Sequence, residues 1–274
     1  MARLSLGWLK PPKVPADGVM SLADHLRELR YRLIFSMVTI AVGTILCAVF
    51  YMPLFEFLLE PWRNATEILA GIRPNLEVTA VLSGVTAPII LALMVCAVGG
   101  VVLTSPIWLY HVWAYLAPAL LAKEKRYALL FLLAAVPLFL AGIVLGYVVA
   151  PQAFALMLGF TPDVFEIQNL VPVDSFLTLM LQLMLVFGVG FLMPVVVVSL
   201  NLMGVVSAAA LGSARSYVMF GCAVFAAAAT PGGDPFSMIA LAIPMMLLFL
   251  LAELICRFND KRRAKRAGTD LVTA

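Results

Sequence analysis

Six runs of apolar residues, separated by polar segments, set the pattern of this chain. A helix needs about 20 such residues to cross a hydrocarbon core of roughly 30 Å, because it rises about 1.5 Å per residue. The pattern therefore predicts an all-α polytopic membrane protein with six transmembrane helices. The predicted spans lie in residues 34–52, 85–110, 127–150, 176–206, 217–229 and 236–256.

Proline positions and run lengths predict the shape of these helices. Pro106 lies near the end of the second run and Pro194 lies inside the fourth. A proline inside a helix removes one N–H donor and clashes with the preceding turn, so we expect kinked helices. The fifth run, residues 217–229, covers only roughly 20 Å. We therefore expect a concave bundle with two short last helices.

Lysine and arginine are concentrated on one side of the predicted membrane. With six spans both termini share that side, and all of the 18 Lys and Arg except Arg63 and Arg73 fall on it. An excess of positive charge marks the cytoplasmic side of a membrane protein. We therefore expect both termini in the cytoplasm, with a tail over residues 1–20, a membrane domain over 21–258 and a basic tail over 259–274.

The two long segments on the opposite side are predicted to be acidic outer loops. They cover residues 53–84 and 151–175. Within the first, residues 54–59 are expected to form a short amphipathic helix that Pro61 stops, because proline cannot continue a helical hydrogen-bond ladder.

Composition excludes a soluble domain. The chain is 64% hydrophobic and 12% charged, with a mean hydropathy of +1.06, and long apolar runs of this kind need lipid around them. No motif places a nucleophile beside a base, cradles a phosphate or ligates a metal. We therefore predict no enzyme activity, no cofactor and no metal. The four cysteines show no pairing motif, and we interpret them as small apolar residues.

Polar residues are rare inside the runs, and Gln182 and Asn201 of the fourth run are the clearest. Gln182 is either a helix-packing hydrogen-bonding residue or a functional group. A small-solute secondary transporter is the alternative function. Such proteins tend to have internal repeats and ionisable residues near the midplane, and this sequence has neither.

The last charged segment before the first span contains one carboxylate among arginines. Glu28 stands between Arg27, Arg30 and Arg32, and Asp24 is placed to cap a helix in front of them. Glu28 and Arg32 have the favourable i, i+4 order for an ion pair. The segment is therefore either a solvated helix start with surface salt bridges or a site at which Glu28 recognises a cation.

This segment resembles the opening of the TatC family, the core membrane subunit of the twin-arginine protein translocase. Residues 25–33 read HLRELRYRL, where the family has H-L-x-E-L-R-x-R-L. Residues 105–120 resemble the family's S/A-P-x-x-L-Y-Q-x-W-x-F-x-x-P-x-L stretch, and Lys123 to Arg126 fall where the family has x-E-R-R. Further matching pieces follow in order at residues 187–194, 230–234 and 241–244. The resemblance covers residues 21–258.

The resemblance implies a signal-peptide receptor and scaffold for folded precursor proteins, exported by the proton motive force across the bacterial cytoplasmic membrane. It implies that the cytoplasmic face binds an Arg-Arg motif. Carboxylates are suited to bind this motif, because a guanidinium pairs with a carboxylate in a bidentate manner. The partners implied are TatA- and TatB-type single-span subunits, further copies in a receptor complex and the lipid bilayer, with no nucleic acid. The implied signal-peptide-binding residues are Glu28, Glu124, Leu26, Arg30 and Tyr115.

Three positions depart from the family pattern. Leu192 stands where many relatives have a membrane-buried Glu, Met238 where they often have Gln, and Leu250 where they have a second Glu, with Glu253 one turn later. We expect Gln182 or Glu253 to supply the missing polar contact with a partner. The residues interpreted as partner-docking or structural are Pro61, Pro106, Gln182, Leu192, Pro194, Asp234 and Met238.

Overall fold

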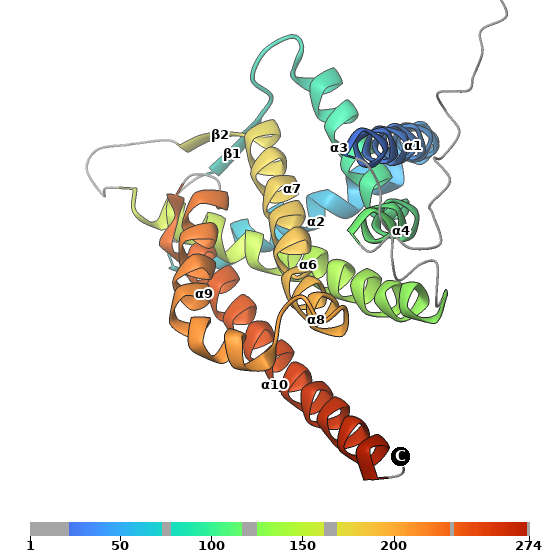
Figure 1. Cartoon of the computed structure of the whole chain (residues 1–274). Coiled ribbons are helices and arrows are strands. Elements are labelled where there is room, and N and C mark those ends of the chain that lie inside the picture. The colour runs from blue at the N-terminus through green and yellow to red at the C-terminus, as the bar shows by residue number, and fades with distance from the viewer. Residues whose placement is uncertain (1–21, 73–77, 117–124, 162–168, 231–232, 273–274) are drawn as a thin grey trace, which may run out of the picture. The chain divides into compact units, whose positions relative to one another are not determined.

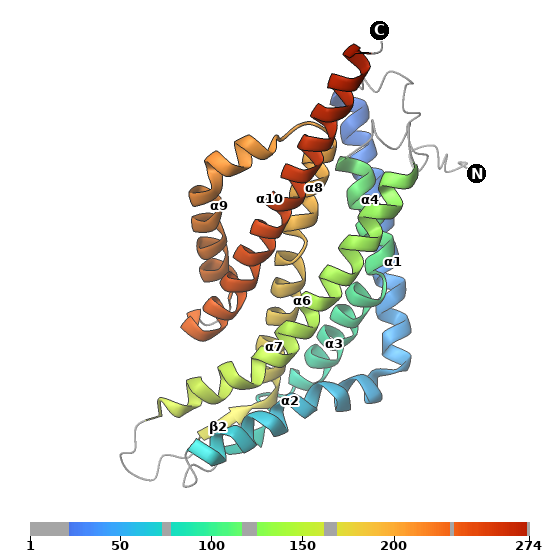
Figure 2. The same cartoon turned by 90° about the horizontal axis from the view of Figure 1, so that it is seen from below.

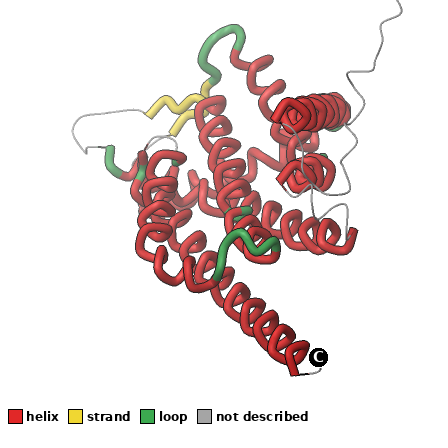
Figure 3. The backbone as a smooth tube through the Cα atoms, in the orientation of Figure 1, coloured by secondary structure: helices red, strands yellow, loops and turns green. Residues whose placement is uncertain are grey.

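The computed structural model describes residues 22–72, 78–116, 125–161, 169–230 and 233–272, which are almost entirely helical (Figures 1 and 3). The elements in chain order are α1 (Leu22–Val49), α2 (Tyr51–Ile72), β1 (Val78–Val81), α3 (Ala87–Leu103), α4 (Ser105–Leu116), α6 (Lys125–Gly159), β2 (Asn169–Pro172), α7 (Val173–Gly190), α8 (Met193–Leu202), α9 (Ala208–Ala229) and α10 (Pro235–Val272).

The predicted number of spans agrees with these helices. Within the described residues, five helices are long and apolar enough to cross a membrane, and α3 with α4 makes a sixth if the pair is one bent span. The bend between α3 and α4 is 62°. It lies at Thr104, two residues before Pro106, so the kink predicted there is present.

The chain forms two compact units. One contains residues 1–50 and 96–136, and the other contains residues 51–95 and 137–274. The first unit packs α1 against α4. In the second, α10 packs against α8 and α9, and Figure 2 shows it running alongside α9 and continuing beyond it to the C-terminal end.

Close helix contact in the first unit depends on two glycines. A Cβ added to Gly43 would lie 2.6 Å from a side-chain carbon of Thr104, and one added to Gly100 would lie 2.6 Å from the backbone N of Thr44. Because Cα alone occupies both positions, α1 and the end of α3 approach each other at backbone distance. This contact is one link between the two parts of the sequence that form the unit.

The first outer segment is a long helix and not the loop that we predicted. Pro61 lies inside α2 and does not stop it. The buried side chains of α2 recur at helical spacing, at Leu58, Pro61, Ala65 and Leu69. Burial of this face compensates for the hydrogen bond that proline removes. Beside Pro61, Trp62 packs on an aromatic cluster of α6 and α7.

Two short strands are an exception to the predicted all-α fold. β1 pairs in parallel with β2, so that Val78 lies opposite Asn169 and Val81 lies opposite Pro172. The pairing joins parts of the two predicted outer loops that are about ninety residues apart in sequence. Each strand has only four residues, which is too short for a period-two pattern to indicate a strand in the sequence.

Helix lengths correct two further expectations. The third span does not end at Ala150, because α6 continues through Pro151 to Gly159. The last two helices are not short: α9 has 22 residues and α10 has 38. Helix α9 begins well before Tyr217, because Ser207 caps it by accepting a hydrogen bond from the N–H of Ala210 and the following residues are good helix formers.

The fourth span breaks where Pro194 was expected to kink it. α7 ends at Gly190 and α8 begins at Met193, with Leu192 at its N-cap and Pro194 in its first turn. The position of Leu192 is therefore a helix break, and its side chain lies next to a groove that is described below.

Candidate functional site

Glu28 is a buried carboxylate on α1. It is 2% exposed, and its Oε1 accepts a 2.8 Å hydrogen bond from Nε of Arg32 and a second bond from Nη2 of the same guanidinium. The predicted i, i+4 pair is therefore formed. Oε2 is buried and has no hydrogen-bond partner within the described part of the chain. Leaving a buried polar atom without a hydrogen-bond partner costs free energy. Binding of a ligand that donates a hydrogen bond to Oε2 would remove this cost.

An apolar cavity lies beside this ion pair. Its volume is about 310 Å³, and Arg32 forms part of its wall, so the charged pair and the cavity adjoin. Both α1 and α4 contribute to the lining. The lining residues are Leu29, Arg32, Leu33, Ser36, Met37, Ile40, Trp108, His111, Val112 and Tyr115.

Two aromatic contacts join α1 to α4 beside the cavity. The ring of His25 stacks on that of Tyr115 with centroids 4.6 Å apart and planes 15° apart. One turn of α4 earlier, His111 contacts Phe35 of α1 with centroids also 4.6 Å apart. These two contacts hold α1 against α4. Tyr115, which the sequence assigned to the site, is thus placed on the same cavity as Arg32.

The other predicted signal-peptide residues differ in their placement. Leu26 is 54% exposed, and Arg30 is also exposed. Asp24 lies in the first turn of α1, where it pairs with Arg27 at 3.4 Å. Glu124 lies outside the described residues, so its distance from Glu28 stays a prediction.

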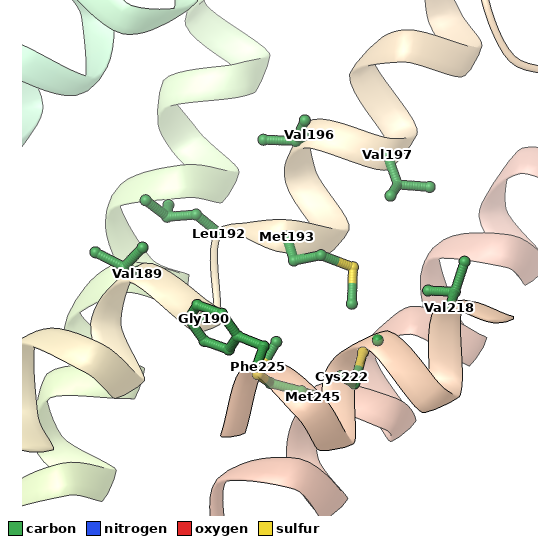
Figure 4. Close-up of a pocket in the computed structure, with 11 residues that line it drawn as sticks. Val189, Gly190, Leu192, Met193, Val196, Val197, Val218, Cys222, Phe225 and Met245 are labelled. Carbon is green, nitrogen blue, oxygen red and sulfur yellow. The ribbon is translucent and has the colours of Figure 1, made fainter. Parts of the chain in front are cut away.

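A groove in the other unit has Leu192 in its wall. Its volume is about 570 Å³, and its lining is almost wholly apolar. Figure 4 shows Met193 of α8 and Cys222 of α9 pointing toward one another across it. The lining residues are Val189, Gly190, Leu192, Met193, Val196, Val197, Val218, Gly221, Cys222, Phe225 and Met245.

Gln182 lies exposed on α7, and no hydrogen bond of its side chain occurs among the described residues. It is seven residues, or two turns, before Val189, so both lie on one helix face. Gln182 was interpreted either as a helix-packing hydrogen-bonding residue or as a functional group. No hydrogen bond among the described residues supports the first interpretation. The groove and an exposed amide therefore share one side of α7.

Asp234 has a structural position. Its Oδ1 accepts a 2.6 Å hydrogen bond from the N–H of Ser237, so it caps α10. Its Oδ2 is buried without a partner among the described residues. Met238, in the next turn, is half-buried. Pro61, Pro106 and Pro194 lie in or beside helices as described above, and a role of any of these residues in docking partners stays a prediction.

Glu253 is engaged within the chain. It is 2% exposed, and its two oxygens accept hydrogen bonds of 2.8 and 3.0 Å from Arg215 of α9 and of 2.6 and 3.1 Å from Arg257 of α10. Oε1 accepts three of these bonds and Oε2 accepts one, so both carboxylate oxygens are engaged within the chain. The surroundings of Glu253 therefore do not favour the expected contact with a membrane partner.

Sequence reasoning missed two features of these sites. It did not anticipate the ring contacts of His25 and His111 or the cavity beside Arg32. The available signal was the apolar run that follows Arg32, which indicates a membrane helix but not what packs against it. The Arg215–Glu253 pair, 38 residues apart, had no sequence signal.

Comparisons with known proteins agree on one family. A family model described as Sec-independent protein translocase protein (TatC) matches residues 24–244. The chain is 34% identical over 257 residues to the Sec-independent protein translocase protein TatC of Frankia casuarinae, covering 92% of this chain and 70% of that protein. It is 30% identical over 245 residues to TatC of Aquifex aeolicus, covering 89% and 98%.

A solved structure is similar along almost its whole length. The crystal structure of the twin arginine translocase receptor TatC superposes with a TM-score of 0.70 and 30% sequence identity. The match covers 85% of this chain and 99% of the crystallised one.

Proposed function

The chain belongs to the TatC family of Sec-independent protein translocase proteins, and we propose that it is the subunit that binds the paired arginines of a signal peptide at the cytoplasmic face. Membership makes the protein a multi-pass component of a protein translocase and not an enzyme. Receptor function, its side of the membrane and its ligand belong to the proposal.

The observation that carries this proposal is the free Oε2 of Glu28. Arg32 occupies only Oε1, so one carboxylate oxygen is left in a buried site without a donor. A guanidinium suits such a site better than an ammonium, because it is planar, always charged and presents several N–H donors in a fixed geometry. We expect Glu28 to rotate toward the solvent side and take one arginine of the motif through Oε2.

Two arginines next to Arg32 would place three cations around one carboxylate. A second acid is therefore needed, since like charges at close range repel strongly in a poorly hydrated site. Glu124 fills this role in the proposal. Leu26 and Arg30 are exposed on the same helix and are proposed to contact the peptide around the motif.

The cavity beside Arg32 suits the apolar part of the same ligand. Signal peptides carry an apolar segment of 7–15 residues after a positively charged region. The cavity offers about 310 Å³ lined by apolar and aromatic side chains, and Tyr115 stands at its wall. One apolar side chain of the peptide entering it would place the arginines next to Glu28.

The test is binding of a signal peptide with Arg-Arg, against the same peptide with Lys-Lys, to the purified protein in nanodiscs. We expect preference for Arg-Arg, and Glu28→Gln is expected to weaken Arg-Arg binding roughly 10- to 100-fold, because a hydrogen bond to a charged group contributes about 1.5–3 kcal/mol. Glu124→Gln is expected to act in the same direction. Fluorescence anisotropy of a labelled peptide gives both affinities.

Asp24→Asn is the matched control. It removes the same charge one turn away, from a partly exposed pair with Arg27, and such pairs contribute little. We expect less than a threefold change. Equal binding of both peptides, or equal effects of the Glu28 and Asp24 variants, would contradict the receptor proposal.

For the partners, we propose that a single-span TatA- or TatB-type subunit lays its transmembrane helix in the groove beside Leu192. The apolar lining suits a helix within the membrane, where close packing and not burial from water drives association. The exposed amide of Gln182 on the same side of α7 would then hydrogen-bond to a polar residue of that helix.

A large side chain in the groove is expected to displace this partner. The Cβ of a residue at Gly221 meets nothing within 4 Å, so Gly221→Leu fills part of the groove without strain in this chain. Co-purification of the single-span subunits is expected to fall about tenfold, and Gln182→Leu is expected to lower it less, since one membrane hydrogen bond contributes about 0.6–2 kcal/mol.

Gly71→Leu on α2 is the control for this experiment, because its Cβ also meets nothing within 4 Å. Normal recovery of both single-span subunits with Gly221→Leu would contradict docking in the groove. Residence in the bacterial cytoplasmic membrane with both termini inside, self-association in a receptor complex and use of the proton motive force are parts of the same proposal.

A further inference from the structure

A basic pocket lies between the N-terminal part of α9 and the later part of α10. Its volume is about 640 Å³. Three of its lining residues are cations, which come from both helices. The lining residues are Ala208, Ala209, Gly212, Ser213, Arg215, Arg257, Asp260 and Lys261.

Buried Glu253 holds the two arginines of the pocket in place. Each uses Nε and Nη2 to bond Glu253, which is buried, while Arg215 remains 44% exposed and Arg257 53% exposed. The Nη1 groups of both arginines are left out of these bonds. Buried Glu253 thus orients two guanidinium groups whose remaining donors are available to a ligand.

The pocket retains positive charge. Glu253 balances one of the two arginines. Asp260 also lines the pocket and is negatively charged; its oxygens accept hydrogen bonds from the N–H of Ala208 at 2.7 Å and the amide of Asn201 at 3.0 Å. The three cations of the pocket therefore outnumber Glu253 and Asp260 by one charge. Lys261 follows Arg257 by one turn on the same face of α10 and is exposed. The groups left for a ligand are therefore N–H donors and cations.

Small side chains make room at this point. A Cβ added to Gly212 would lie 3.4 Å from Nη2 of Arg257 and 3.5 Å from Glu253. The neighbouring lining residues on α9, Ala208 and Ala209, are also small. A ligand of the size of a phosphate group therefore has space directly against the guanidinium groups.

The pocket lies where an apolar surface meets a charged one. Before Arg257, α10 exposes Leu251 and Leu254 at 52% and 49%; after it the helix carries charged residues, as at Lys261. On α9, Tyr217 is 81% exposed, two residues beyond Arg215. The change from exposed apolar residues to charged residues along α10 matches the boundary between lipid acyl chains and headgroups.

We propose that this pocket binds the phosphate of an anionic phospholipid headgroup, with the acyl chains along the exposed apolar faces of α9 and α10. A phosphate diester accepts several hydrogen bonds from guanidinium groups, and basic pockets between transmembrane helices bind anionic headgroups. The site is in the other unit from Glu28 and does not depend on signal-peptide binding.

Native mass spectrometry of the purified protein with added phosphatidylglycerol or phosphatidylcholine tests the proposal. We expect preferential retention of phosphatidylglycerol. Lys261→Gln is expected to weaken it about fivefold and Lys261→Gln with Arg257→Gln about 30-fold, since each cation near a membrane surface contributes about 1 kcal/mol. Lys261→Gln alters no described ion pair, so it keeps the test valid if the double variant folds poorly.

Arg63→Gln is the control, because it removes one exposed cation from a pair with Glu60 on α2; retention is expected to be unchanged. Equal retention of both lipids, or retention unaffected by Lys261→Gln, would overturn the proposal. Stabilisation by millimolar inorganic phosphate in phosphatidylcholine nanodiscs, at constant ionic strength and as large as that by phosphatidylglycerol, would assign the pocket to a soluble anion and also overturn it.

Discussion

Replacing Gly142 and Gly146 together by alanine is expected to destabilise the folded protein by about 3 kcal/mol or more, because overpacking a tight contact costs about 1–3 kcal/mol per site. A Cβ at Gly142 would lie 2.4 Å from the carbonyl oxygen of Phe187, and one at Gly146 would lie 2.7 Å from Cα of Met184. These atoms are backbone, so no side-chain rotation relieves the clash, and α6 and α7 must move apart.

Two effects oppose one another in this experiment. Alanine favours a helix over glycine by roughly 0.5–1 kcal/mol, whereas the clash with backbone costs more. Gly71→Ala isolates the first effect, because its Cβ meets nothing within 4 Å. Thermal unfolding in detergent is expected to show a lower midpoint for the double variant and an unchanged or slightly higher one for Gly71→Ala. A double variant as stable as the parent protein would show that α6 and α7 do not cross at this distance.

Replacing Arg215 and Arg257 together by methionine is expected to destabilise the protein and lower its unfolding midpoint. The change leaves Glu253, which is 2% exposed, without either of its partners, and an unpaired buried charge is destabilising. Loss of apolar packing does not contribute, because methionine retains a long apolar side chain.

A triple variant separates an unpaired charge from a damaged fold. Adding Glu253→Met to the two arginine replacements removes the buried carboxylate itself, and replacing a buried ion-pair network by apolar residues is often neutral or stabilising. We therefore expect the unfolding midpoint to recover most of the loss. A triple variant as unstable as the double one would mean that the arginines stabilise the helix pair by contacts other than those with Glu253.

The sequence predicted most of the secondary structure, and two of its failures have different causes. Pro61 was expected to end a helix, but the buried stripe of Leu58, Ala65 and Leu69 keeps α2 continuous. At Pro61 packing therefore prevails over local propensity. At the start of α9 the Ser207 cap and the alanines that follow it extend the helix, although the predicted span began only at Tyr217.

The functional residues show the same division. Glu28 was identified from the charge pattern, and its pair with Arg32 follows from i, i+4 spacing. The free Oε2, the cavity against Arg32 and the stacking of His25 on Tyr115 require α4 to lie on α1. The Gly142-x-x-x-Gly146 spacing was present in the sequence and was overlooked, although small residues at this spacing are typical of close membrane helices.

The sequence by itself determined the number of spans, the expected orientation and the family, because apolar run length, the distribution of lysine and arginine and local motifs are properties of consecutive residues. Only the tertiary structure decided that Glu253 is neutralised by Arg215, that β1 pairs with β2, and that grooves open beside Arg32 and Leu192. Those features join residues far apart in the chain, and their free energy comes from contacts that form only when the helices pack.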